Sequence, residues 1–285
     1  MLQYELGISK YEHALPVSLL YRLANSKVVR ILLDAGCTVD QADNRGATPL
    51  YIAAQEGHHE VVRLLADKGA NLDLAENKGG QTPVFKAAQE GHHEIVGVLA
   101  DKGANLDLAE KHGATPLCIA AQKGHHKVVR VLAENKADLN LARGSNGIAP
   151  AHLAAQGGFL AILRLLKKHK ARLHEPTTRG WTPMHYAAHH GHLDIVYYLA
   201  RHGADLAHLD NNGRSALDTA RNMGHATIVT LLEAVQSAGG WREYIARLRL
   251  PYCRIRHKVS RYGLVCPASL RLRDQQRLYH FVFGA

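Results

Sequence analysis

The chain has 285 residues, of which 46% are hydrophobic and 21% charged, a balance that excludes an intrinsically disordered protein. No apolar run approaches the roughly 18 residues of a membrane-spanning helix, and residues 1–10 lack the basic start and apolar core of a secretory signal. The net charge is +10 and the four cysteines form no CxxC pair, so we expect an intracellular soluble protein, in the cytoplasm or alternatively the nucleus.

Residues 10–42 contain a degenerate copy of a pattern that is clearer later in the chain. The segment VVRIL at residues 28–32 returns as VVRLL at residues 61–65, and Pro16 lies 33 residues before Pro49. Terminal repeats are expected to be atypical, since one of their faces meets water. Residues 1–9 precede this copy, and we expect them to be poorly ordered.

Six clearer copies follow, as far as residue 237. The position before each first helix recurs in steps of 34, 33, 34, 33 and 33 residues, at Thr48, Thr82, Thr115, Ala149, Thr182 and Ser215. The two longer steps contain extra residues near Gly79-Gly80 and Gly144-Ser145, in turns, where insertions are tolerated. A fixed period near 33 predicts a repeat solenoid.

Each copy reads as two short helices and a projecting turn. In the second unit, Thr48 can cap the first helix and Pro49 fills its first position, where no N–H is needed. Gly57 ends that helix and Gly69 ends the second one. Gly97 of the third unit lies inside a second helix, where glycine costs about 1 kcal/mol relative to alanine. The apolar residues expected to face neighbouring units are Leu50, Ala53, Ala54, Val61, Val62, Leu64 and Leu65.

These units resemble the ankyrin repeat, as the copy GATPLYIAAQEGHHEVVRLLADKGANLDLAE at residues 46–76 shows. The resemblance covers roughly four fifths of the chain. It implies an all-α solenoid of about seven helix–turn–helix units with projecting β-turn tips and a basic helical tail. We number the units one to seven, and their expected bounds are 10–42, 43–76, 77–109, 110–143, 144–176, 177–209 and 210–237, with the tail at 238–285.

The resemblance also implies where a partner protein would bind, namely at the turn tips and the exposed ends of the first helices. The candidate contacts are Arg45, Lys78, Gln81, His112, Asn146, Ile148, Arg179, Trp181, His189 and Arg214. Trp181 has two interpretations. It is either an interface anchor, which would place the centre of binding on units five to seven, or a scaffold residue that covers Ile148.

The 20 histidines do not indicate a metal site, because equivalent residues of stacked units lie about 8–10 Å apart and zinc ligands must share one centre. In ankyrin-like repeats the histidine after the glycine is structural and bonds to backbone of a neighbouring turn. Here that position is His58, His92, His125, His192 and His225. No GxxxxGK[ST], GxSxG or HExxH motif occurs, so we predict no enzymatic activity and no cofactor. Asp73, Glu76 and Asp107 recur with the repeat and are expected to order turns.

The tail from residue 238 carries ten Lys and Arg against two acidic residues, which gives it +8 of the net charge. Trp241, Tyr244, Ile245 and Leu248 have the spacing of a short amphipathic helix. It has three interpretations: a cap on the seventh unit, an adaptor module that resembles in part the suppressor-of-cytokine-signalling box, or a basic arm for nucleic acid or an anionic membrane.

These observations predict a monomeric, non-catalytic scaffold or adaptor that binds another protein on its concave face and uses no small-molecule substrate. The alternatives are a substrate-recognition subunit of a ubiquitin ligase, with the tail as its adaptor-binding module, and a regulator that associates with nucleic acid or an anionic membrane through the tail.

Overall fold

The computed structural model describes residues 25–248, and this part of the chain is all helical, without a β-strand. The helices alternate between two sets. The first helices of the units are α4 (Pro49–Glu56), α6 (Pro83–Glu90), α8 (Pro116–Lys123), α10 (Pro150–Gln156), α12 (Pro183–His189) and α14 (Ala216–Asn222). The second helices are α3 (Ser26–Asp34), α5 (His59–Asp67), α7 (His93–Asp101), α9 (His126–Glu134), α11 (Leu160–Lys168), α13 (Leu193–Arg201) and α15 (Ala226–Ala238).

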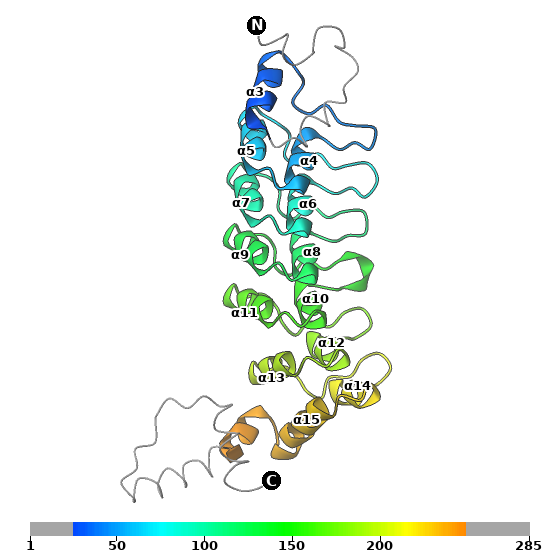
Figure 1. The fold of residues 1–285 in the computed structure, drawn as a ribbon. Helices are drawn as coiled ribbons and strands as arrows, with labels where there is room; N and C mark the ends of the chain where they lie inside the picture. Colours follow the sequence, from blue (N-terminus) through cyan, green and yellow to red (C-terminus); the bar gives the residue numbers. More distant parts are fainter. Residues whose placement is uncertain (1–24, 249–285) are drawn as a thin grey trace, which may run out of the picture.

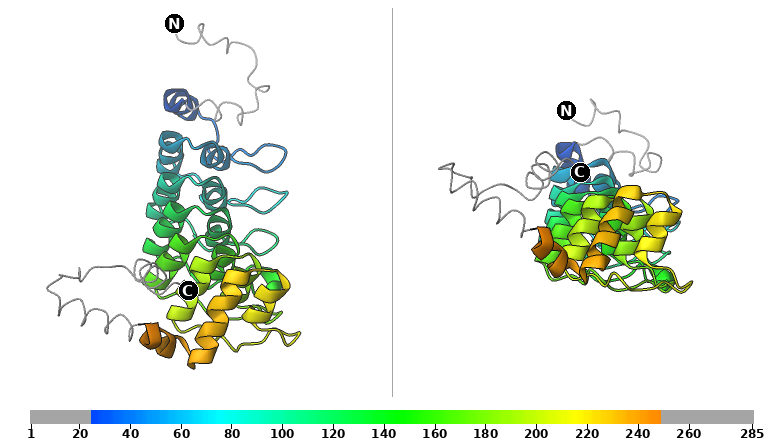
Figure 2. Two further views of the ribbon diagram at one scale, coloured as in Figure 1. Left: turned by 60° about the horizontal axis from the view of Figure 1, so that its bottom comes forward. Right: turned by 90° about the horizontal axis from the view of Figure 1, so that it is seen from below.

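The two sets form two parallel columns, and the turns project to one side of the column of first helices (Figure 1). Viewed from below, along the array, the units lie behind one another as a linear stack (Figure 2). From α4 to α13, each helix packs against the other helix of its unit and against the neighbouring equivalent helices of the described residues. This is the solenoid that the period of the sequence predicts.

Local sequence explains where the helices begin and end. The Thr48 hydroxyl accepts a hydrogen bond from Tyr51 N at 3.1 Å, and Pro49 occupies the first helical position. Gly57 ends α4 with φ at +84°. A Cβ atom there would lie 2.9 Å from the ring of His92, so only glycine lets the next unit pack this closely. The predicted boundaries of α4 are therefore confirmed.

Small residues set the spacing of the units. The paired alanines of the first helices, from Ala53 and Ala54 to Ala187 and Ala188, are completely buried. Together with the aliphatic pairs of the second helices they form one continuous core from Val29 to Leu232. A unit without neighbours would expose its own part of this core to water, so the stability of each unit depends on the units beside it.

The beginning of the tail follows α15 as a helix at residues 241–248. Trp241 is half-buried against the core, and its ring meets that of Tyr197 on α13 at a centroid distance of 4.7 Å. This contact is with the sixth unit, so the helix lies against the flank of the array. The rest of the tail, residues 1–9 and the first helix of unit one lie outside the described residues.

Candidate functional site

Buried carboxylates shape the turn tips. The carboxylate of Glu76 accepts hydrogen bonds from the backbone N–H groups of Lys78, at 2.7 Å, and of Gly79. Burial alone would raise the pKa of Glu76, but these bonds outweigh it and lower the pKa below its usual value. The predicted role of Glu76 in ordering a turn is confirmed.

Consecutive turn tips are also joined to each other by backbone hydrogen bonds. Asn77 N donates to Arg45 O at 2.7 Å, and Lys111 N donates to Gly79 O at 2.9 Å. Thr178 N and Asn211 N continue the series at the tips of units six and seven. Among the described residues, no such bond joins the tips of units four and five, where the chain instead forms the short 3₁₀ turn η1 (Gly144–Asn146).

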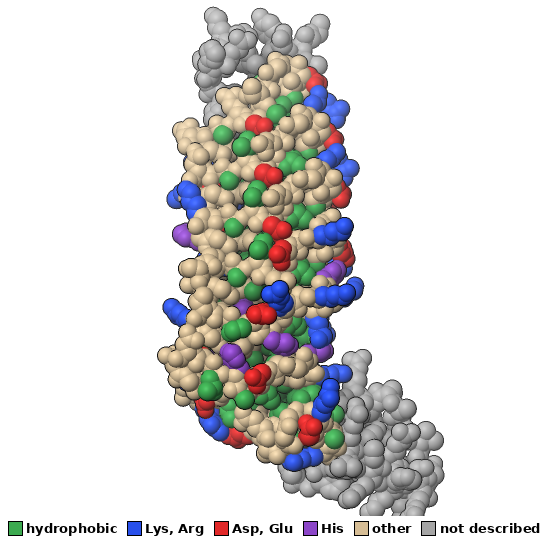
Figure 3. Space-filling view, turned by 180° about the vertical axis from the view of Figure 1, so that it is seen from behind, with side chains coloured by type: hydrophobic (Ala, Val, Ile, Leu, Met, Phe, Trp, Pro, Cys, Tyr) green, Lys and Arg blue, Asp and Glu red, His purple; other side chains and the backbone are tan. Residues whose placement is uncertain are grey.

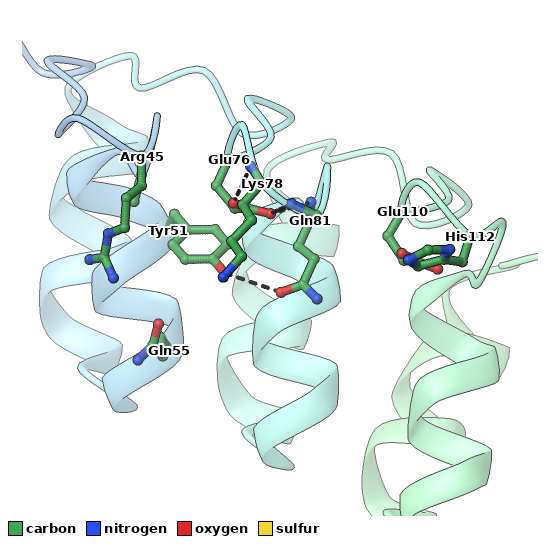
Figure 4. Close-up of a pocket in the computed structure, with 10 residues that line it drawn as sticks. Arg45, Tyr51, Gln55, Glu76, Lys78, Gln81, Glu110 and His112 are labelled. Carbon is green, nitrogen blue, oxygen red and sulfur yellow. Dashed lines mark hydrogen bonds between the residues drawn. The ribbon is translucent and has the colours of Figure 1, made fainter.

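A hollow of about 420 Å³ lies across the tips and first helices of units two to four. Four of the predicted contact residues, Arg45, Lys78, Gln81 and His112, line it together (Figure 4). Arg45, Lys78 and His112 are exposed, whereas Glu76 and Glu110 lie buried beneath them. The hollow therefore presents hydrogen-bond donors to an incoming chain, while its carboxylates are already occupied by backbone N–H groups.

Tyr51 forms the wall of the hollow and was not predicted to be part of the site. Its hydroxyl donates to Gln81 Oε1 at 3.2 Å, across the boundary between units two and three (Figure 4). Burial raises the pKa of Tyr51 to about 12, so the phenol stays neutral. The sequence offered one signal, because polar or aromatic residues recur at this position as Tyr51, Phe85, Cys118, His152 and His185.

A second cluster surrounds Trp181 on units six and seven. The indole N–H donates to Asp210 Oδ2 at 3.1 Å, and Arg214 donates to the same oxygen at 2.8 Å. Burial alone would raise the pKa of Asp210, but the bonds from Arg214, Asn212 and Trp181 hold it well below its usual value. The ring of Trp181 meets that of Tyr186 at 5.1 Å and that of His189 at 5.4 Å.

Trp181 is thus half-buried and bonded to Asp210 of unit seven. Asn146 and Arg179 contribute backbone carbonyls to the tip-to-tip bonds. Their side chains are exposed. Ile148 lies half-buried against the core. The predicted residues therefore do not form one site: four of them line the hollow of units two to four, and Trp181, His189 and Arg214 meet on units six and seven. Asn146 and Ile148 of unit five belong to neither cluster.

The histidines after the glycines have the structural role that the resemblance implies. Nε2 of His92 bonds to Gln55 O at 3.1 Å, and His125, His192 and His225 repeat this contact one unit at a time. In unit five Phe159 stands at the same position, so the boundary between units four and five lacks this bond as well. No group of three or more potential metal ligands occurs within residues 25–248.

Seen from behind, the array shows small hydrophobic, acidic and basic clusters that recur from unit to unit (Figure 3). No continuous apolar patch crosses this face. In the part of the chain that the structure describes, no helix is long and apolar enough to cross a membrane.

Comparison with known proteins agrees with this architecture. A family model for ankyrin repeats in three copies matches residues 16–76, 72–143 and 151–237. The crystal structure of the human ASB11 ankyrin repeat domain is similar, with a TM-score of 0.67 and 24% sequence identity over 76% of this chain and 97% of that one. At this identity the likeness concerns the fold alone. A search of curated proteins finds no match.

Proposed function

Because the chain belongs to the ankyrin repeat family, whose repeats generally bind other proteins and are generally non-catalytic, we propose that it is a scaffold or adaptor that holds a partner protein on its turn-tip face. The observation that carries the proposal is the hollow of units two to four, where exposed donor side chains stand on turns fixed by buried carboxylates. Expected locations are the cytoplasm and, as the alternative, the nucleus.

The geometry of the hollow suits an extended segment of a partner. Arg45 is held over the hollow by its own ion pair, with its Nη2 3.0 Å from Asp43 Oδ2. Lys78 takes part in no ion pair of the described residues and remains available. A side chain fixed as Arg45 is loses little conformational entropy on binding, which favours recognition of a second chain.

The test compares capture of proteins from native lysate by the full chain and by two triple variants. The hollow variant is Arg45→Ala/Lys78→Ala/His112→Ala. The control is Arg30→Ala/Arg63→Ala/Arg130→Ala, which removes three exposed cations from second helices. Proteins captured by the wild type and the control but lost from the hollow variant would support the proposal. Full retention of every captured protein by the hollow variant would contradict it.

The ligase and nucleic-acid alternatives depend mainly on tail residues outside those described, and they stay predictions. Co-purification of elongin-like and cullin-like subunits with the full chain, lost when the chain is ended at Ser237, would favour the ligase alternative.

A further inference from the structure

Charge is distributed unevenly along the array. Units two and three, residues 43–109, contain six Lys and Arg against ten acidic residues, a net charge of −4. Units four and five, residues 110–176, contain eleven Lys and Arg against four acidic residues, a net charge of +7. The molecule therefore has an acidic part followed directly by a basic part, although the array as a whole is nearly neutral.

The excess positive charge gathers where the second helices of units four and five end and their turns begin. Five exposed residues form what we call the basic band: Lys136, Lys167, Lys168, Lys170 and Arg172. Their side chains take part in no ion pair or hydrogen bond in the described part of the chain. The acidic residues nearest in sequence are Glu134, Asp138 and Glu175, so the cations outnumber them.

Earlier units place other residue types at the same positions. Lys168 is equivalent to Asp34 and Asp67, which form ion pairs of 2.9 Å and 2.6 Å with the lysines Lys68 and Lys102 of the following units. In units four and five those lysine positions are Asn135 and His169, and neither forms an ion pair in the described residues. The ladder of neutralising pairs therefore ends before the basic band.

The side chain that accepts a backbone hydrogen bond from the next unit also changes in units four and five. Asp40, Asp73 and Asp107 each accept a backbone N–H bond from the next unit, at 3.1, 3.0 and 3.0 Å. The next acceptor is the neutral amide of Asn140, which receives Arg172 N at 2.8 Å. The bond that fixes the turns is kept, whereas the negative charge beside Arg172 is lost.

Two of the lysines occupy a backbone conformation that disfavours them. Lys136 and Lys170 both have φ of +65°, while the equivalent residues of other units are Gly36, Gly69, Gly103 and Gly203. A Cβ atom at those glycines would meet nothing within 4 Å, so the lysines fit sterically but carry the strain of a left-handed backbone. Strain of this kind is typical of functional sites. Units four and five thus carry a charged residue where glycine would be more stable.

We propose that the basic band binds an acidic segment of a partner protein, on a surface separate from the turn tips. An extended segment of about six residues spans roughly 20 Å, which is the length of the two basic units stacked about 10 Å apart. A longer rod-like polyanion along the array would meet the negative charge of units two and three and be repelled. The size of the basic part therefore favours a short carboxylate-rich segment over a nucleic acid.

The experiment measures binding of a fluorescent peptide of about six alternating Glu and Ser residues to the full-length chain at low salt. The test variant is Lys136→Gly/Lys170→Gly, and the control is Lys123→Gln/Lys127→Gln, which removes the same charge from exposed, unpaired lysines where α8 ends and α9 begins. Since the tail is present in every protein, its own attraction for the probe cancels in the comparison.

We expect the glycine variant to bind the probe about fivefold more weakly than the control while melting at a higher temperature than the wild type. A loss of binding in a more stable protein cannot be attributed to misfolding. Equal affinities of the test and control variants would overturn the proposal. So would a duplex DNA of matched charge that binds more tightly than the peptide and loses its affinity in the glycine variant, because the band would then be a nucleic-acid surface.

Discussion

At the scale of single residues, two buried histidines bond the first helices of units five and six to turn backbone. Nδ1 of His152 accepts a bond from Ala149 N at 3.0 Å, and its Nε2 donates to Glu175 O at 2.9 Å. His185 of unit six likewise accepts from Thr182 N at 3.3 Å, and its Nε2 donates to Arg214 O of unit seven at 3.2 Å. A ring that accepts at one nitrogen and donates at the other must be neutral. Burial lowers the pKa of His152 to about 4.

This histidine makes the stability of the array depend on pH. The pKa of His152 is lower in the folded chain than the value of 6.5 expected when the chain is unfolded. Its contribution to the free energy of unfolding is therefore complete above about pH 6.5 and is lost as the pH falls toward 4. Between pH 7.5 and 5 the loss should be about 2 kcal/mol. Urea unfolding of the wild type and His152→Gln at both pH values tests this. A variant with the same pH dependence as the wild type would contradict the assignment.

Trp181 offers a second test at this scale. Trp181→Phe keeps most of the ring but removes the N–H bond to Asp210, and should lower the free energy of unfolding by about 1–2 kcal/mol. Trp241→Phe is the matched control, since the Trp241 indole forms no hydrogen bond within the described residues. If Trp181→Phe were as stable as the control, the bond to Asp210 would not contribute. Trp181→Ala with unchanged partner affinity and lower stability would assign Trp181 to the scaffold.

At the scale of helices, glycine has opposite effects at two positions. Gly97 lies inside α7 with helical geometry, and an added Cβ would meet Val131 Cγ1 at an ordinary 3.8 Å. Gly97→Ala should therefore raise the free energy of unfolding by about 1 kcal/mol. Gly57→Ala should lower it, because the residue has a left-handed φ and a close contact with His92. Thermal melts of the two variants test both signs, and a destabilised Gly97→Ala would show that α7 needs its glycine.

The helices themselves could be predicted from the sequence because their signals are local. Thr48, Pro49 and Gly57 mark the two ends of one helix within ten residues, and the same three residue types recur at this spacing in units three, four and six. The hollow could be predicted only in part, since its wall is a contact between Tyr51 and Gln81 of different units. The backbone strain at Lys136 and Lys170 could have been inferred from the glycines at equivalent positions.

At the scale of the whole molecule, the boundary between units four and five has fewer links than the other boundaries from unit two to unit seven. The tip-to-tip backbone bond is absent from the described residues there, and Phe159 replaces the histidine that bonds to the preceding unit elsewhere. The bond between Asn140 and Arg172 N remains, at 2.8 Å. The candidate hollow lies wholly on one side of this boundary, and the Trp181 cluster lies on the other.

Proteolysis should detect this difference between the tips. Trypsin can cut after Arg45, Lys78, Arg143 and Arg179, each of which lies at a turn tip. Cleavage requires local opening of the chain, so among these four sites we expect the bond after Arg143 to be cut first. Mass spectrometry of a brief digest identifies the order. Earlier cleavage at Arg45, Lys78 or Arg179 would show that the missing links do not weaken this boundary.

Because the boundary between units four and five has fewer links, the array should bend more easily there than elsewhere. If the hollow and the Trp181 cluster bind a single partner, bending at units four and five would change the angle between these two binding surfaces. The contacts within each surface would be kept. Under a pulling force applied to the ends, this is where the stack should part first, leaving two shorter stacks that each keep their own core.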